Sequence, residues 1–184
     1  MDEALLGTML ASTLRLATPL IFCALAGLFS ERSGVVDIGL EGKMLFAAFA
    51  AGASGAVFGS TAIALLVAML VAVSLSWMHG LACVSHRGDQ VVSGVAINII
   101  AAGLTVVLGI AWFAQGGQTP PVATDVRIQP LFPAVVDGLA GIPIVGAIIG
   151  GGLLSHSAMV YFAYLLVPLS WWLLYRTRFG LRLR

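Results

Sequence analysis

The hydrophobic positions of this chain fall into long, nearly unbroken runs with no alternating pattern. A helix that crosses a bilayer needs about 20 mostly apolar residues, because about 30 Å of hydrocarbon is crossed at about 1.5 Å per residue. Unpaired backbone groups are costly in lipid, so such runs form helices or a closed barrel, and the absence of alternation favours helices. The sequence therefore predicts about five membrane-spanning helices, near residues 5–29, 44–59, 61–84, 91–114 and 158–175.

A long segment, residues 115–157, separates the fourth and fifth of these runs. Its first half is polar and contains Pro120 and Pro121, whereas residues 139–154 are apolar and rich in glycine. Because consecutive glycines weaken a helix, the second half is predicted to be a re-entrant or interface-lying element. A sixth span at this place is the alternative.

Composition agrees with a membrane location. The chain has 184 residues, is 60% hydrophobic and carries only 9% charged residues, where soluble domains carry about 25%. So few charges cannot cover the surface of a soluble protein, and the apolar surface must face lipid. The expected fold is all-α, a polytopic transmembrane helix bundle that forms a single domain over residues 1–184.

Lysine and arginine residues set the expected orientation, because they gather in cytoplasmic loops. The tail after the fifth run holds Arg176, Arg178, Arg182 and Arg184, and the short connection near residues 84–91 holds His86 and Arg87, whereas the 115–157 segment holds a single arginine. The tail is therefore predicted to be cytoplasmic. Counting back through five spans places the N-terminus outside and residues 115–157 in an extracytoplasmic loop.

The densest polar cluster joins the first two runs, at residues 30–43. Glycines at 34, 39 and 42 let the backbone turn, and Asp37 and Glu41 lie four positions apart, on one face if the segment is helical. A glycine-broken, charged start of a membrane span is the pattern expected where backbone lines a cavity. A solvated cytoplasmic loop followed by an ordinary short helix is the alternative, and spacing does not decide between them.

A second polar point opens the fourth run with Asp89, Ser93 and Asn98. Asp89 is expected to cap the helix, where its N-terminal dipole favours a carboxylate. The amide of Asn98 lies about two turns into an apolar helix and needs a partner, which is either a neighbouring helix or a hydroxyl of a solute on the substrate path.

Other features favour structural roles. Gly52, Gly55 and Gly59 form a small-residue ridge that predicts close helix packing. Arg15 is expected to snorkel out of the first run. Cys23, Cys83 and the three histidines show no metal-ligand spacing, so neither a metal nor a cofactor is expected. A net charge of +1 offers no basic field for nucleic acid.

Three blocks resemble the permeases of ABC importers that serve simple sugars and nucleosides, a family related to branched-chain amino acid and ribose permeases. They cover residues 13–42, 89–98 and 175–184, in the family's order and over nearly the whole chain. The family pattern carries asparagine where this chain has Asp37, a departure that adds an acid. The resemblance corresponds to the N-terminal portion of such a permease, so the chain is expected to be truncated.

The resemblance implies a multi-pass protein of the plasma (inner) membrane of a bacterium. It implies three protein partners: a cytoplasmic ATPase, a second permease chain that is homologous or identical, and an extracytoplasmic substrate-binding protein. Its translocation path would include Asp37, Glu41, Ser93 and Asn98, and its ATPase-facing residues would be Arg176, Arg178, Arg182 and Arg184.

The chain itself carries no motif for nucleotide hydrolysis, so it is not expected to be an enzyme. A secondary transporter or channel that couples ions or protons through Asp37, Glu41 and Asp89 is the main alternative. A membrane scaffold without transport, packed through its small residues, is the third.

Overall fold

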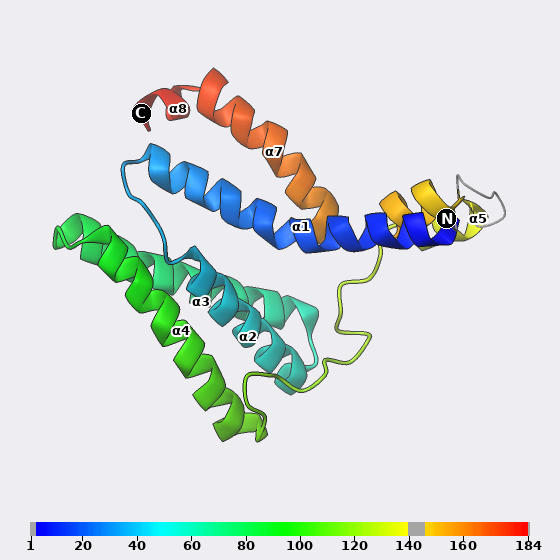
Figure 1. Cartoon of the computed structure of the whole chain (residues 1–184), viewed down its shortest axis with the longest axis horizontal. Helices are drawn as coiled ribbons and strands as arrows, with labels where there is room; N and C mark the ends of the chain where they lie inside the picture. Colours follow the sequence, from blue (N-terminus) through cyan, green and yellow to red (C-terminus); the bar gives the residue numbers. More distant parts are fainter. Residues whose placement is uncertain (1–2, 140–145, 184) are drawn as a thin grey trace. The chain divides into compact units, whose positions relative to one another are not determined.

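The computed structural model describes residues 3–139 and 146–183, and helices make up most of them (Figure 1). In these two ranges the extended backbone pairs only at an isolated bridge between Pro130 and Ser157. The expected all-α fold is therefore confirmed. The helices in chain order are α1 (Glu3–Arg32), α2 (Leu40–Phe58), α3 (Thr61–Gly80), η1 (Leu81–Ser85), α4 (Gln90–Phe113), α5 (Pro133–Leu139), η2 (Gly146–Leu154), α7 (Ala158–Arg176) and α8 (Arg178–Arg182).

Four of the described helices are long and apolar enough to cross a membrane: Leu5–Arg32, Thr61–Ser85, Gln90–Phe113 and Ala158–Arg176. They coincide with four of the five predicted spans. The remaining run, 44–59, lies in α2, which begins at Leu40 and includes Glu41 and Lys43. Because these two charges lower its hydropathy, α2 is not among the four, and its passage through the membrane stays a prediction.

The chain divides into two compact units, Ala26–Arg127 and Met1–Leu25 together with Ile128–Arg184. In the unit formed by Met1–Leu25 and Ile128–Arg184, α5 packs on η2. In the same unit, Phe22 of α1 lies beside Phe162 of α7 with ring centroids 6.3 Å apart. The apolar segment 139–154 thus contains the short π-helix η2, which has only nine residues. Residues 140–145 of that segment lie outside the described part of the chain, and its re-entrant placement stays a prediction.

The unit Ala26–Arg127 is built on α2, α3 and α4, drawn in cyan to green in Figure 1. Near the start of α2, Gly42 bonds to Asn98 of α4, and farther along both helices the rings of Phe49 and Trp112 lie 6.2 Å apart. The two helices therefore run in the same direction. The helix that connects the end of α2 to the start of α4, α3, runs antiparallel to both. Residues 117–127 then fold back along α2, and the Thr61 hydroxyl at the start of α3 donates to the Val126 carbonyl over 2.6 Å.

The start of α4 is capped as expected. The Asp89 carboxylate accepts hydrogen bonds from the backbone N–H groups of Val91 and Val92, at 2.8 and 3.0 Å. These groups would otherwise have no partner within the helix. The capping interpretation of Asp89 is confirmed, and its carboxylate is committed to the backbone.

The closest approach in this unit is between α2 and α4 at Gly42. A Cβ atom at this position would lie 2.7 Å from the Asn98 Cα atom and 2.9 Å from the Ile97 carbonyl oxygen. Both atoms belong to the α4 backbone, so no side-chain rotation could relieve the contact. Glycine at 42 therefore sets the distance between the two helices.

We expect Gly42→Ala to lower the midpoint of thermal unfolding in detergent, measured by circular dichroism, by an amount equivalent to about 1–3 kcal/mol of overpacking. Gly103→Ala is the matched control, because Gly103 also lies within a helix of this unit and has no atom within 4 Å of an added Cβ. The control should leave the midpoint unchanged or raise it. Equal midpoints for both variants would contradict the close-packing interpretation.

Candidate functional site

A buried polar cluster lies where the segment before α2 meets α3 and α4. Asp37 is its centre: one carboxylate oxygen, Oδ2, pairs with the Lys43 ammonium, and the other, Oδ1, accepts a hydrogen bond from the Gly39 N–H over 3.1 Å. Oδ1 also lies 3.7 Å from Nε2 of His79. We call Asp37, Lys43, His79 and Ser93 the polar cluster.

The charges of the polar cluster are almost completely removed from solvent. The side chains of Asp37, Lys43 and His79 are 9%, 5% and 3% exposed. An isolated charge in such surroundings costs several kcal/mol, and pairing with an opposite charge and with hydrogen bonds offsets that cost. Asp37 and Lys43 are therefore tolerated inside the helix bundle as a pair.

His79 connects the ion pair to the other helices. Its Nδ1 atom shares a 3.0 Å hydrogen bond with the Ser93 hydroxyl of α4, and both ring nitrogens lie within 3.8 Å of the Cys83 sulfur. His79 sits in the last turn of α3, one turn before Cys83 in the π-helical extension η1. One imidazole therefore links the segment before α2 to α3 and α4.

The first turns of α4 also hold the glycine-rich segment of residues 33–39. The Gln90 amide oxygen accepts from the Val36 N–H over 2.6 Å. Farther along α4, the Asn98 amide accepts from the Gly42 N–H at 2.8 Å and donates to the Ile38 carbonyl at 3.1 Å. Side chains of α4 thus satisfy backbone groups of the turn and of the first turn of α2 that have no partner within a helix.

Of the predicted path residues, Asp37, Ser93 and Asn98 come together around this segment, and Glu41 does not. The Glu41 side chain is exposed in the first turn of α2. Asn98 makes the neighbouring-helix contact that was one of its two expected roles. Whether any of the four contacts a solute stays a prediction.

Sequence reasoning missed Lys43 and His79 as members of the cluster. Asp37 and Lys43 are six positions apart, a spacing that places two residues on different faces of a helix. They meet because Asp37 precedes α2 and its backbone turns back toward the helix. The available sequence signal was electrostatic, because a lysine and an aspartate within one short segment that enters an apolar helix are expected to form an ion pair when buried.

The three glycines of the predicted packing ridge have different surroundings. A Cβ at Gly52 would lie 2.6 Å from the Thr119 hydroxyl oxygen, and one at Gly55 would meet Ala64 and Val122 at 3.5 Å. Gly59 instead follows α2 as its C-cap with φ 60°, and no atom lies within 4 Å of its Cβ position. Gly59 therefore differs from the expectation, because it ends the helix in a left-handed conformation and does not pack between helices.

The arginines of the tail follow α7. Arg176 ends that helix, and Arg178 and Arg182 bound the short helix α8, which the Thr177 hydroxyl caps by accepting from the Gly180 N–H. Arg184 lies outside the described residues. Arg15 is exposed on α1. The residues described contain no group of three or more metal-ligating side chains.

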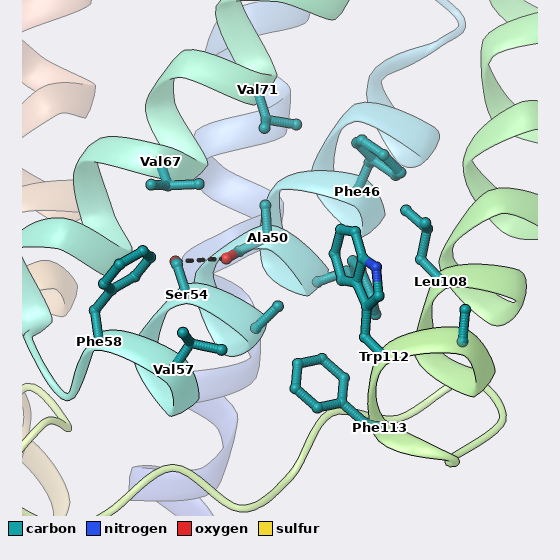
Figure 2. A pocket seen from close by; sticks show the side chains of 13 residues that line it. Phe46, Ala50, Ser54, Val57, Phe58, Val67, Val71, Leu108, Trp112 and Phe113 are labelled. Atoms are coloured by element: carbon teal, nitrogen blue, oxygen red, sulfur yellow. Dashed lines mark hydrogen bonds between the residues drawn. The ribbon is translucent and has the colours of Figure 1, made fainter.

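An apolar cavity of about 580 Å³ opens among α2, α3 and α4, toward the ends of α2 and α4 that lie away from the polar cluster (Figure 2). We call it the aromatic cavity, because Phe46, Phe49, Phe58, Trp112 and Phe113 are among its lining residues. A second cavity of about 390 Å³, the polar pocket, is lined by Leu45, Ala48, Phe49, Thr105, Gly117, Gln118 and Thr119. Phe49 lines both.

Four apolar helices of spanning length, together with an ion pair buried in the unit Ala26–Arg127, indicate a multi-pass membrane protein. Comparison with known families makes this more specific: residues 9–184 match the family described as the branched-chain amino acid transport system, permease component. The chain belongs to this family, whose members are non-catalytic subunits of the plasma (inner) membrane.

Several characterised relatives are similar to the chain. The guanosine ABC transporter permease protein NupQ of Bacillus subtilis is 38% identical over 98% of this chain and 56% of its own length. The nucleoside ABC transporter permease protein NupC of Lactococcus lactis is 34% identical over 95% of this chain and 54% of its own length. A putative glucose ABC transporter permease of Haloferax volcanii is 33% identical over 95% of this chain and 50% of its own length.

The chain thus spans about half the length of these relatives. The family resemblance expected from residues 13–42, 89–98 and 175–184 is confirmed. No solved structure matches the chain.

The ion pair gives a direct prediction. Asp37→Asn keeps the acceptor for the Gly39 N–H but leaves Lys43 buried without its counter-charge. Lys43→Met leaves the Asp37 carboxylate buried without its counter-charge. We expect each single change to destabilise the folded protein by about 3 kcal/mol or more, because an unpaired buried charge remains. Thermal unfolding in detergent, followed by circular dichroism, measures the loss.

The double variant Asp37→Asn with Lys43→Met removes both charges and should lose clearly less stability than the two single variants added together. A coupling energy of about 1–3 kcal/mol is expected for residues in direct contact. Strict additivity would show that the two side chains do not stabilise each other.

Proposed function

We propose that this protein is a permease subunit of an ATP-driven importer and forms part of the translocation path for a nucleoside or simple sugar. The observation that supports this most directly is the family match over residues 9–184, together with relatives named as guanosine, nucleoside and glucose permeases. The buried polar cluster and the two cavities are compatible with a path between helices.

The energy for transport would come from a separate ATPase on the cytoplasmic face, because permeases of this family are not themselves catalytic. An extracytoplasmic binding protein would deliver the solute, and a second permease chain, homologous or identical, would complete the path. Arg176, Arg178 and Arg182 in the tail, with Arg184 beyond them, would face the ATPase. Their positive charge without acidic neighbours suits an acidic partner surface.

Within this subunit, the polar cluster would hold the glycine-rich segment 33–39 in a fixed position at the start of α2. Asp37, Ser93 and Asn98 would then shape the path by orienting backbone groups, since their side chains already bond within the protein. Glu41, which is exposed in the first turn of α2, would be the predicted path residue placed to meet a solute.

A secondary transporter is the second candidate, and the buried Asp37, Lys43 and His79 are the observation that favours it, because proton relays use such groups. The two candidates differ in their energy source. Cells that express the protein with its partners should take up radiolabelled guanosine only while they contain ATP. Uptake that persists after ATP depletion, with the proton gradient maintained, would contradict the importer proposal.

The proposed orientation places residues 115–157 outside and the tail in the cytoplasm. After Cys23 and Cys83 have been replaced by alanine, a single cysteine at Asp125 should react with an impermeant maleimide in intact cells. A cysteine at Thr177 should react only after permeabilisation. The reverse labelling pattern would show that the orientation is inverted.

A further inference from the structure

We propose that the aromatic cavity binds the base of a nucleoside and that the polar pocket beside it receives the ribose. This inference rests on the proposed function and narrows it, because it assigns the protein to nucleosides over simple sugars. It also names the residues that would make this selection: Phe49 and Trp112 for the base, and Thr105 for the ribose.

The aromatic cavity has the size and the lining for a planar ring. Its volume of about 580 Å³ lies within the range of small-molecule sites, about 300–1,000 Å³. Ser54 is a polar residue of its lining, and its hydroxyl already donates to the Ala50 carbonyl over 2.6 Å. A sugar placed there would lose the water bound to its hydroxyls without regaining partners, which is unfavourable. An aromatic base presents apolar faces and avoids much of that cost.

The aromatic side chains of the cavity are arranged for stacking. The ring centroids of Phe46 and Phe49 are 6.4 Å apart with the planes inclined by 29°, and those of Phe49 and Trp112 are 6.2 Å apart at 26°. Figure 2 shows the side chains of Phe46, Phe58 and Trp112 among those that line the cavity. Nearly parallel rings of this kind provide flat faces on which a base can stack.

The polar pocket supplies what the aromatic cavity lacks. Thr105 is buried and donates its hydroxyl hydrogen to the Ala101 carbonyl over 2.8 Å, so its oxygen can still accept from a ligand hydroxyl. Gln118 and Thr119 add an amide and a second hydroxyl to the same lining. Because Phe49 lines both spaces, an apolar and a hydroxyl-binding site are adjacent, which corresponds to the two halves of a nucleoside.

The location is also appropriate for a solute that arrives from outside. The aromatic cavity includes the last turns of α2 and α4, and the polar pocket is lined by the middle of these helices and by residues 117–119, whereas the polar cluster lies near their starts. In the proposed orientation this end is extracytoplasmic, the side from which a binding protein would deliver the solute.

The test uses Trp112 as its own reporter. In a variant with Trp77→Phe, Trp171→Phe and Trp172→Phe, reconstituted in lipid nanodiscs, Trp112 is the remaining tryptophan. Guanosine should quench its fluorescence in a saturable manner, whereas ribose and glucose at the same concentrations should not. Phe49→Leu in this background should raise the apparent Kd for guanosine about tenfold or more, as expected for loss of base stacking.

Phe22→Leu is the matched control, because Phe22 also belongs to an aromatic pair but does not line the cavity. It should leave the apparent Kd unchanged. Thr105→Val, which keeps the shape of the side chain, is a second variant and should weaken guanosine binding severalfold. Far-UV circular dichroism verifies that each variant is folded.

Three outcomes would overturn the inference: no quenching by guanosine, equal quenching by glucose, or equal effects of Phe22→Leu and Phe49→Leu. Quenching by lipids with brominated chains that guanosine does not relieve would also overturn it, since an acyl chain would then occupy the cavity. ATP-driven uptake without base-selective binding would refute this inference alone. Base-selective binding with uptake that does not need ATP would instead refute the importer proposal.

Discussion

The pairing of Asp37 with Lys43 is the interaction on which the arrangement of α2, α3 and α4 depends. Water stabilises charges far better than a protein interior does, so these two groups can be buried only if each satisfies the other. The pair holds Asp37 in place, and Asp37 in turn bonds to Gly39 and lies next to His79 of α3. Through His79 and Ser93 the same carboxylate is connected to α4. A single pair of charges therefore links the glycine-rich segment to three helices.

Steric fit acts together with these charges. Gly42 lets the α4 backbone come close enough for the Asn98 amide to bond to both sides of the turn before α2. A larger residue would separate the helices and break those hydrogen bonds together with the packing. The lack of a side chain at Gly42 and the side-chain amide of Asn98 thus contribute to the same contact between α2 and α4. This contact sets the parallel course of α2 and α4, and that course brings Phe49, in the middle of α2, beside Trp112 in the last turn of α4.

Much of the fold could be predicted from hydrophobic run length, because lipid imposes a minimum span and forbids unpaired backbone. The preference of a helix N-terminus for a carboxylate anticipated the cap at Asp89, and the hydrophobic pattern located α1, α3, α4 and α7. Sequence reasoning was weaker for Gly59, where the small-residue pattern suggested packing and the structure shows a helix end, since glycine serves both purposes equally well. It missed Lys43, for which the opposite charge was the available signal. It could not identify His79 as a neighbour of Asp37, because that contact depends on how α3 returns beside α2, which no local sequence pattern records.

The pairing of Asp37 with Lys43 restricts which substitutions either position can accept. A change that removes one charge alone leaves the other buried and uncompensated, whereas a joint change to neutral residues leaves no such charge. Positions 37 and 43 should accordingly vary together among close relatives, with charge present at both or at neither.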